Sequence, residues 1–233
     1  MYLGLLDEIE RRTLRCVPSA KLTHLGLDLS ESLCRENLER LLERARAGGG
    51  LCWIDMESTA YTDRTLALYE SLKPRYPNLA CVVQAYLRRS EDDVKRLIRL
   101  GPIVRLCKGA YREPAHLAFA TRREVDENYA RLMDLLVSPE ARATGTYPAF
   151  ATHDPRLHAR AAGRAAELQI PPDRFEIQML YGIRHDLHDL LKRQGLQLRV
   201  LVPFGEEWYG YLVRRLAERP ANLLFLLKNL LRP

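Results

Sequence analysis

Four polar residues near the carboxyl end of the chain have the spacing of one helix face: Tyr211, Arg214, Arg215 and Glu218. Positions i, i+3, i+4 and i+7 lie on the same side of a helix, so this side is charged where a core-facing stripe is apolar. Two neighbouring guanidinium groups suit a small carboxylate, because each offers it paired N–H donors. Taken alone, the helix is explained more simply by a solvated face. The rest of the chain favours a ligand site.

The composition indicates one globular domain over residues 1–233. The chain is 47% hydrophobic and 28% charged, which is enough for one substantial core. Its net charge is +6, but the cationic residues are spread along the sequence and form no basic stripe, so nucleic-acid binding is not predicted. Only six of the 36 cationic residues are lysines, so a lysine inside an apolar segment needs a reason.

No sequence feature indicates secretion or a membrane span. The five cysteines show no CxxC pairing, which favours reduced, packed thiols in a cytosolic protein. The first 15 residues form an amphipathic pattern with acidic residues, unlike a signal peptide, and no apolar stretch is long enough to cross a bilayer. We expect the most apolar segment, residues 222–231, to dock onto the domain, with a membrane or partner contact as the alternative.

Short apolar runs alternate with helical patterns along the chain. Strands are predicted at residues 19–24, 51–56, 79–86, 104–108, 148–153, 175–180 and 198–203, and helices at residues 30–47, 60–75, 90–100, 122–137, 154–168 and 186–194. This alternation predicts an α/β fold with right-handed βαβ units and a parallel sheet. Ser30 and Ser90 stand where helix N-caps are expected. Periodicity alone does not choose between an open sheet and a closed barrel.

Most of the predicted strands finish in polar residues. These are Lys21 and His24, Asp55 and Glu57, Gln84, Arg105 and Lys108, Thr152 and His153, and Gln178. In a parallel barrel such positions gather at the carboxyl-terminal edge, where barrel enzymes place their chemistry. Each residue has a structural explanation of its own, such as capping of the next helix by Asp55 or Glu57. Their recurrence at strand after strand favours a shared site for an anionic ligand or an electron-rich cofactor.

Three other kinds of site are disfavoured. The six histidines include one i, i+3 pair, His185 and His188, but no HExxH spacing and no convincing third ligand, so no metal is predicted. The sequence also contains no nucleophile elbow around a serine and no GxxxxGK[ST] phosphate loop.

Seven segments in register closely resemble proline dehydrogenases of the monofunctional bacterial type. They are AKLTHLGL (20–27), IDME (54–57), VVQAY (82–86), VRLCKGAY (104–111), FATHD (150–154), FEIQMLYGIR (175–184) and YLVRRLAE (211–218). The resemblance implies a (βα)8-type TIM barrel, of which seven of the eight strands are recognisable in this chain. It also implies oxidation of L-proline to Δ1-pyrroline-5-carboxylate by hydride transfer to FAD, with the electrons then passed to a quinone, as the first step of proline catabolism.

The resemblance also implies roles for individual residues. The lysine matching Lys21 and the arginines matching Arg214 and Arg215 grip the proline carboxylate in the family, and the residues matching Tyr111 and Glu218 help to shape the site. The positions matching the FAD-binding residues are Asp55, Gln84, Arg105, Lys108, Gly109, Ala110, Thr121, Arg122, Thr152, His153, Gln178 and Leu180.

The chain departs from the family pattern in two places. Family members carry helices and one more strand ahead of the Lys21 strand, so we expect this chain to lack the first barrel strand. Leu201 stands where the family typically has a tyrosine, which predicts looser selection between proline and hydroxyproline-like analogues. Two alternatives therefore stay open: a truncated, inactive relative that at most binds a ligand, and a barrel oxidoreductase acting on a different small carboxylate. We expect a cytoplasmic protein, with peripheral contact at the inner face of the membrane as a further expectation.

Overall fold

The computed structural model describes residues 1–203 and 205 of the chain. Its main feature is one sheet of seven parallel strands, in which each strand pairs with the next one along the chain. The strands are β1 (Ser19–Ala20), β2 (Cys52–Ile54), β3 (Leu79–Gln84), β4 (Ile103–Cys107), β5 (Tyr147–Ala151), β6 (Glu176–Leu180) and β7 (Leu198–Leu201). The α/β class and the seven parallel strands expected from the alternating pattern are confirmed.

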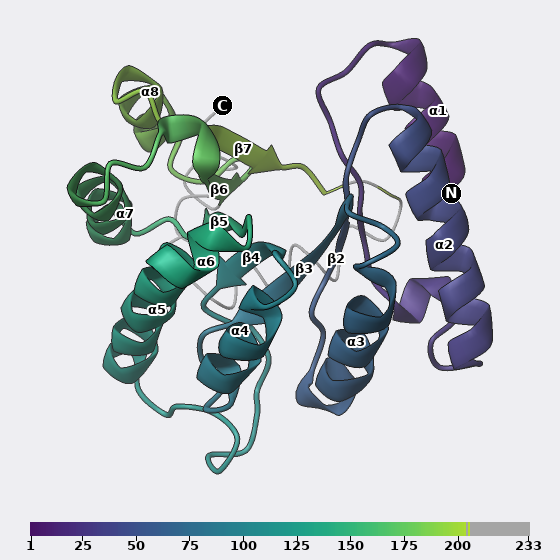
Figure 1. The fold of residues 1–233 in the computed structure, drawn as a ribbon, viewed down its shortest axis with the longest axis horizontal. Coiled ribbons are helices and arrows are strands. Elements are labelled where there is room, and N and C mark those ends of the chain that lie inside the picture. Colours follow the sequence, from purple (N-terminus) through teal and green to yellow (C-terminus); the bar gives the residue numbers. More distant parts are fainter. Residues whose placement is uncertain (204, 206–233) are drawn as a thin grey trace, which may run out of the picture.

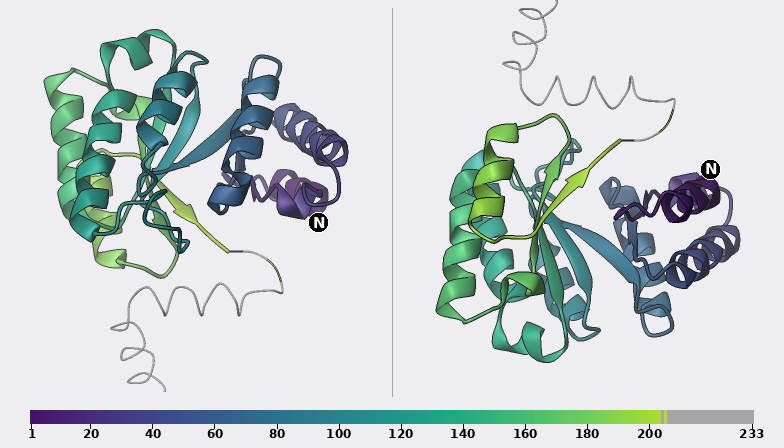
Figure 2. Two further views of the ribbon diagram at one scale, coloured as in Figure 1. Left: turned by 90° about the horizontal axis from the view of Figure 1, so that it is seen from below. Right: turned by 90° about the horizontal axis from the view of Figure 1, so that it is seen from above.

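Helices follow the outside of the curled sheet (Figures 1 and 2). They are α1 (Tyr2–Arg11), α2 (Glu31–Ala47), α3 (Thr59–Leu72), α4 (Ser90–Ile98), α5 (Arg122–Leu136), α6 (Pro139–Ala143), α7 (Pro155–Glu167) and α8 (His185–Arg193). Helix α6 and the short 3-10 helix η2 (Pro172–Arg174) were not predicted. Within the described residues, β1 and β7 are the two edges of the sheet and neither pairs with a further strand. No helix of this part of the chain has the length and apolar character needed to cross a membrane.

The first predicted strand is shorter than expected. β1 has two residues, after which the chain turns into the 3-10 helix η1 (Thr23–Leu25), so Lys21 follows the strand and His24 lies in the helix. The Glu57 carboxylate holds this turn by accepting hydrogen bonds from the Thr23 amide at 3.2 Å and the Thr23 hydroxyl at 2.9 Å. The loop after β2 is therefore tied to the loop after β1, at the carboxyl ends of both strands.

The structure excludes helix capping as the alternative explanation for Asp55 and Glu57. Neither Asp55 nor Glu57 caps this helix, whose N-cap is Ser58 without a side-chain hydrogen bond. Instead, the Thr59 amide donates to the Glu113 carboxylate at 2.8 Å. Because Glu113 belongs to the long loop between β4 and α5, a segment far along the chain satisfies the first turn of α3.

One of the two predicted N-caps is confirmed and one is wrong. The Ser30 hydroxyl accepts a hydrogen bond from the Leu33 amide, as an N-cap does. Ser90, however, is already the first residue of α4, because Arg89 has helical dihedral angles and takes the cap position. The Ser90 hydroxyl turns back and donates to the Leu87 carbonyl at 2.7 Å.

Large apolar side chains close the outer face of the sheet. Leu38 and Leu42 of α2, Tyr69 of α3 and Tyr129 of α5 are fully buried. The Tyr129 hydroxyl donates to the Leu106 carbonyl of β4 at 3.0 Å, which fixes α5 against the back of that strand. Polar side chains of the strands therefore have to point to the inner face, because successive strand residues alternate between the two faces.

Three of the cysteines, Cys34, Cys52 and Cys81, are buried and have the expected packing role, whereas Cys16 is exposed. All five are free. Cys52 and Cys81 are fully buried on β2 and β3, and burial raises the pKa of each thiol to about 12. These two thiols therefore stay protonated at neutral pH and act as small apolar residues.

Candidate functional site

Arg105 is the centre of a polar network inside the curl of the sheet. Its guanidinium lies over the Trp53 ring, 4.5 Å from the ring centroid. Its Nε donates to Gln178 Oε1 at 2.5 Å, and its Nη1 donates to Asp55 Oδ1 at 3.0 Å and to Ser19 Oγ at 3.2 Å. The residue is only 8% exposed, so this buried cation is satisfied by one carboxylate and two neutral acceptors.

These contacts show how strongly the sheet curls. Arg105 lies on β4, the middle strand, whereas Ser19 and Gln178 lie on β1 and β6. Neighbouring strands are about 4.8 Å apart, so one side chain reaches a strand three places away only if the sheet bends around it. Arg105 and Gln178 are each the third residue of a five-residue strand. The expectation that these two residues lie at the strand ends is therefore wrong, and the site reaches down into the interior.

A second group of polar residues continues the network from Gln178 to the edge strand β7. Gln178 Nε2 donates to Glu176 Oε1 at 2.5 Å, and Arg199 binds both carboxylate oxygens of Glu176, Nε and Nη2 each at 2.8 Å. The sequence reasoning missed Glu176, Arg199 and Trp53. Strand alternation could have indicated two of them, because residues two apart in a strand lie on the same face. Glu176 stands two residues before Gln178, and Trp53 stands two residues before Asp55.

Gln84 Oε1 and the Lys21 ammonium have no partner in the part of the chain that the structure describes. Gln84, the last residue of β3, is 3% exposed, and its Oε1 is buried without a hydrogen bond. The half-buried Lys21 forms no hydrogen bond or ion pair through its ammonium with any residue of 1–203. A buried acceptor and an unpaired cation are both costly unless a ligand or water satisfies them, so these atoms mark where a ligand would bind.

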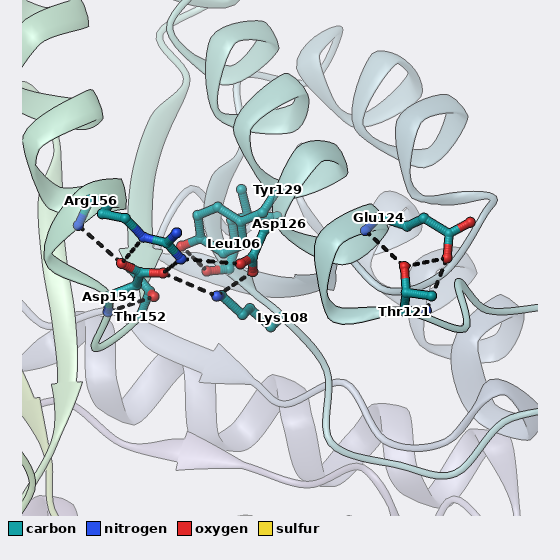
Figure 3. A network of polar contacts seen from close by, with 9 residues as sticks. All are labelled: Leu106, Lys108, Thr121, Glu124, Asp126, Tyr129, Thr152, Asp154 and Arg156. Carbon is teal, nitrogen blue, oxygen red and sulfur yellow. Dashed lines mark hydrogen bonds and ion pairs between the residues drawn. The ribbon is translucent and has the colours of Figure 1, made fainter.

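Lys108 lies at the end of β4 within a balanced set of charges (Figure 3). Its ammonium forms an ion pair with Asp126 and lies 3.7 Å from an Asp154 oxygen. Arg156 joins the same two carboxylates, at 2.8 Å from Asp154 and 3.5 Å from Asp126. Hydrogen bonding by Arg156 lowers the pKa of Asp154 to about 2. Two cations and two anions cancel here, so Lys108 brings no surplus positive field to the site.

Gly109 has a structural reason to be glycine. Its φ is +109°, a conformation that other residues rarely adopt, and a Cβ at this position would lie 2.1 Å from Cδ1 of the Tyr86 ring. The glycine thus lets the chain pass closely over Tyr86 as it leaves β4. Ala110 and Tyr111 follow on the exposed side of this loop, Tyr111 being 37% exposed.

Residues after β5 and at the end of β6 are bonded to each other. His153 Nε2 accepts a hydrogen bond from the Leu180 amide at 2.9 Å, so the neutral ring carries its proton on Nδ1. The neighbouring Thr152 is 5% exposed, and its carbonyl contacts His158 Nε2 at 2.9 Å. The structure therefore brings Thr152, His153 and Leu180 to one edge of the sheet, above Gln178.

Thr121 and Arg122 stand apart from this group. The Thr121 hydroxyl accepts from the Glu124 amide at 3.2 Å, and the Thr121 amide donates to the Glu124 carboxylate at 2.9 Å, forming a capping box at the start of α5. Figure 3 shows this pair away from the cluster around Lys108. Arg122 is exposed. Their predicted contact with the nucleotide portion of FAD stays a prediction.

The predicted helix that carries Arg214 and Arg215 lies outside the described residues. The structure does not describe residues 206–233, which include Tyr211, Arg214, Arg215 and Glu218 and the apolar segment 222–231. Their predicted roles therefore stay predictions.

Comparison with known proteins identifies the family. A family model described as "Proline dehydrogenase" matches residues 1–228. Proline dehydrogenase 1 of Bacillus subtilis (strain 168) is 40% identical over 227 residues, which are 97% of this chain and 74% of that protein. Proline dehydrogenase of Deinococcus radiodurans is 37% identical over 219 residues, covering 92% of this chain and 69% of the relative.

A solved structure shares the fold. It is proline utilization A (PutA) from Bdellovibrio bacteriovorus inactivated by N-propargylglycine, with a TM-score of 0.82 and 26% sequence identity. The match covers 92% of this chain and 27% of PutA, so the chain spans roughly a quarter of that longer protein. The curled sheet of seven parallel strands thus matches part of PutA, and the sequence matches extend over almost the whole chain. The chain belongs to the proline dehydrogenase family.

Proposed function

We propose that this chain oxidises L-proline to Δ1-pyrroline-5-carboxylate with FAD as the hydride acceptor, and that the electrons then pass to a quinone. Family membership supports the reaction. The single observation that carries the site assignment is the buried Arg105, which Ser19 of β1, Gln178 of β6 and Asp55, the residue after β2, hold in place inside the curled sheet. Such a fixed cation suits a reaction in which negative charge develops on an aromatic ring system.

The residues at the site fit a flavin ring. The isoalloxazine edge has an N–H donor between carbonyl acceptors, and the described residues offer the complementary groups. Gln84 Oε1 is buried and needs a donor, and no described residue accepts from Arg105 Nη2. The residues proposed to hold FAD are Asp55, Gln84, Arg105, Lys108, Gly109, Ala110, Thr121, Arg122, Thr152, His153, Gln178 and Leu180.

The chemistry divides between the cofactor and the protein. Bound FAD supplies the hydride acceptor. Arg105 stabilises the negative charge that develops during hydride transfer, and its own position is fixed beforehand by its hydrogen bonds. Lys21, together with the proposed clamp residues Arg214 and Arg215, neutralises the proline carboxylate and orients the ring, with Tyr111 and Glu218 shaping the site. Cations around the substrate also favour the neutral amine, which is the form able to release hydride.

The electron acceptor sets the proposed location. Quinones are lipid-soluble, so a cytoplasmic enzyme that reduces them needs peripheral contact with the inner face of the membrane. This part of the proposal rests on the family resemblance.

Anaerobic reduction of the purified full-length protein tests the function. The protein is incubated with FAD and freed of unbound cofactor, and L-proline is then added. We expect a yellow protein whose flavin absorbance band bleaches on addition of L-proline, with pyrroline carboxylate as the product. An Arg105→Met variant serves as a comparison, and its band should bleach much more slowly.

Two results would overturn the proposal, and each favours one alternative. A colourless protein that does not bind added FAD indicates an inactive relative. A yellow protein that another small amino or imino acid reduces, but L-proline does not, indicates a barrel oxidoreductase with a different substrate.

A further inference from the structure

Glu176 is a fully buried carboxylate to which the proposed function gives no role. It is the first residue of β6 and only 1% exposed. Its oxygens accept hydrogen bonds from Gln178 Nε2 at 2.5 Å, from Arg199 Nε and Nη2 at 2.8 Å each, and from the Tyr147 hydroxyl at 3.4 Å. A buried charge is costly unless its partners are in place, so all of these groups hold one another in a fixed geometry.

The position of Glu176 determines how the Gln178 amide is oriented. A carboxylate only accepts hydrogen bonds and a guanidinium only donates them, whereas an amide has one end of each kind. Gln178 lies between Glu176 and Arg105, with Nε2 toward the carboxylate and Oε1 toward the guanidinium. The reversed amide would set two acceptors against each other at Glu176 and two donors against each other at Arg105. Glu176 therefore selects the orientation in which Gln178 can bind Arg105.

We propose that Glu176 is a positioning residue for Arg105, acting through Gln178. This inference rests on the proposed function, because it takes Arg105 to lie against the flavin. The contacts run from Arg199 to Glu176, then through the neutral Gln178 to Arg105, and end at Asp55. Two cations and two carboxylates balance, so the network as a whole is neutral. With Nε held by Gln178 and Nη1 held by Asp55, the guanidinium stays over the Trp53 ring, and among the described residues no acceptor binds its Nη2, which is left for the ligand.

The midpoint potential of bound FAD measures this positioning. The full chain loaded with FAD is titrated electrochemically as the parent, Glu176→Gln, Gln178→Met and the double variant. Loosening Arg105 weakens its stabilisation of the reduced flavin. We expect each single variant to lose about tenfold in the preference for reduced over oxidised FAD, which lowers the two-electron potential by about 30 mV. Because Glu176 acts through Gln178, the double variant should shift no further than Gln178→Met alone.

A matched control separates positioning from the general loss of a buried ion pair. Asp93 on α4 is 6% exposed and is bound at both oxygens by Arg89, at 2.8 and 3.0 Å, but it does not touch Arg105. Asp93→Asn should leave the FAD potential unchanged. If Glu176→Gln fails to fold, the charge-balanced pair Glu176→Met with Arg199→Met replaces it, with the same expected shift. In steady-state kinetics, Glu176→Gln should have a lower kcat than the parent and a KM for proline within about twofold of the parent value.

The outcomes distinguish this inference from the proposed function. The positioning of Arg105 by Glu176 through Gln178, called the relay below, is rejected by either of two results, even when the parent oxidises proline. One is an unchanged potential in folded, FAD-loaded Glu176→Gln, and the other is additive shifts in the double variant. A parent that binds FAD but is not reduced by proline contradicts the proposed function, while the electrochemical comparison still decides the relay. A parent that takes up no FAD overturns both.

Discussion

Individual cations of the site differ in whether their charge is already paired. Arg105 is bonded to Asp55 and Lys108 to Asp126, whereas the Lys21 ammonium has no partner within residues 1–203. An unpaired ammonium gains more from an anionic ligand, because binding does not first break an existing ion pair. Among the described residues, Lys21 is therefore the side chain best suited to the substrate carboxylate.

Replacement of Lys21 by methionine tests this role. A charge-assisted hydrogen bond contributes about 1.5–3 kcal/mol, so Lys21→Met should raise the KM for L-proline by about 10- to 100-fold and change kcat less. Lys192→Met, at an exposed position of α8, is the control and should behave like the parent. A KM that stays at the parent value in Lys21→Met would exclude contact with the substrate.

Gly109→Ala tests the close approach to Tyr86. Both the positive φ and the 2.1 Å contact oppose a Cβ, so we expect a loss of at least about 2 kcal/mol in the free energy of unfolding. Gly49→Ala separates the two causes, because Gly49 has a φ of +70° and no atom within 4 Å of the added Cβ. Its expected loss is about 1 kcal/mol. Urea unfolding measures both, and equal losses would mean that the Tyr86 contact carries no cost.

At the scale of elements, the helix starts show what the sequence could and could not predict. Ser30 and Ser90 look alike in sequence, and only Ser30 is a cap. The difference lies in the preceding loop, where Arg89 already has helical dihedral angles and the Leu87 carbonyl takes the Ser90 hydroxyl. Local sequence does not reveal this, because the conformation of the loop depends on its packing against the rest of the chain. Helix α7, in contrast, begins at a cap, Asp154, that also belongs to the charged cluster around Lys108.

The acid end of the pH range should reveal the contribution of Asp154 to stability. Its pKa falls from 3.8 to about 2, chiefly through hydrogen bonding by Arg156. Because the folded pKa is the lower one, this stabilisation is complete above the unfolded pKa and is lost as the pH falls toward about 2. Asp154→Asn keeps an oxygen for the cap but does not titrate. Urea unfolding of both proteins from about pH 6 to about pH 3 should show their stability difference shrinking by about 1 kcal/mol. Parallel curves would contradict this assignment.

For the molecule as a whole, local patterns predicted the number and the parallel direction of the strands, whereas the curl of the sheet was expected only from the resemblance to a barrel family. Each βα unit shows its own period in the sequence, so seven parallel strands follow from local patterns. The curl depends on how the helices pack against one another, which no single segment encodes. For this reason the contacts of Arg105 with Ser19, across three strands, and the relay through Glu176 could not be predicted. The strand-end pattern indicated the edge of the sheet but not the depth of the site.

Hydrogen exchange should follow the position of each strand in the sheet. β4 pairs on both sides and is covered by α5, whereas all four residues of β7 are half-buried and pair on one side among the described residues. Because exchange requires local opening, amides of β4 should exchange at least about 100-fold more slowly than those of β7. Mass spectrometry of peptic fragments measures both strands in one experiment. Equal protection would mean that β7 is not an edge in solution.

The stacking of Arg105 on Trp53 gives the protein a built-in optical probe. The chain has two tryptophans, Trp53 and Trp208, so Trp208→Phe leaves one indole as the only source of tryptophan fluorescence. That indole is 1% exposed and lies directly beneath the guanidinium at the centre of the site. Any ligand that moves Arg105 changes the electric field at the ring, and with it the colour and intensity of the emission. Ligand binding at the site can therefore be followed by the fluorescence of Trp53, without turnover and without an added label.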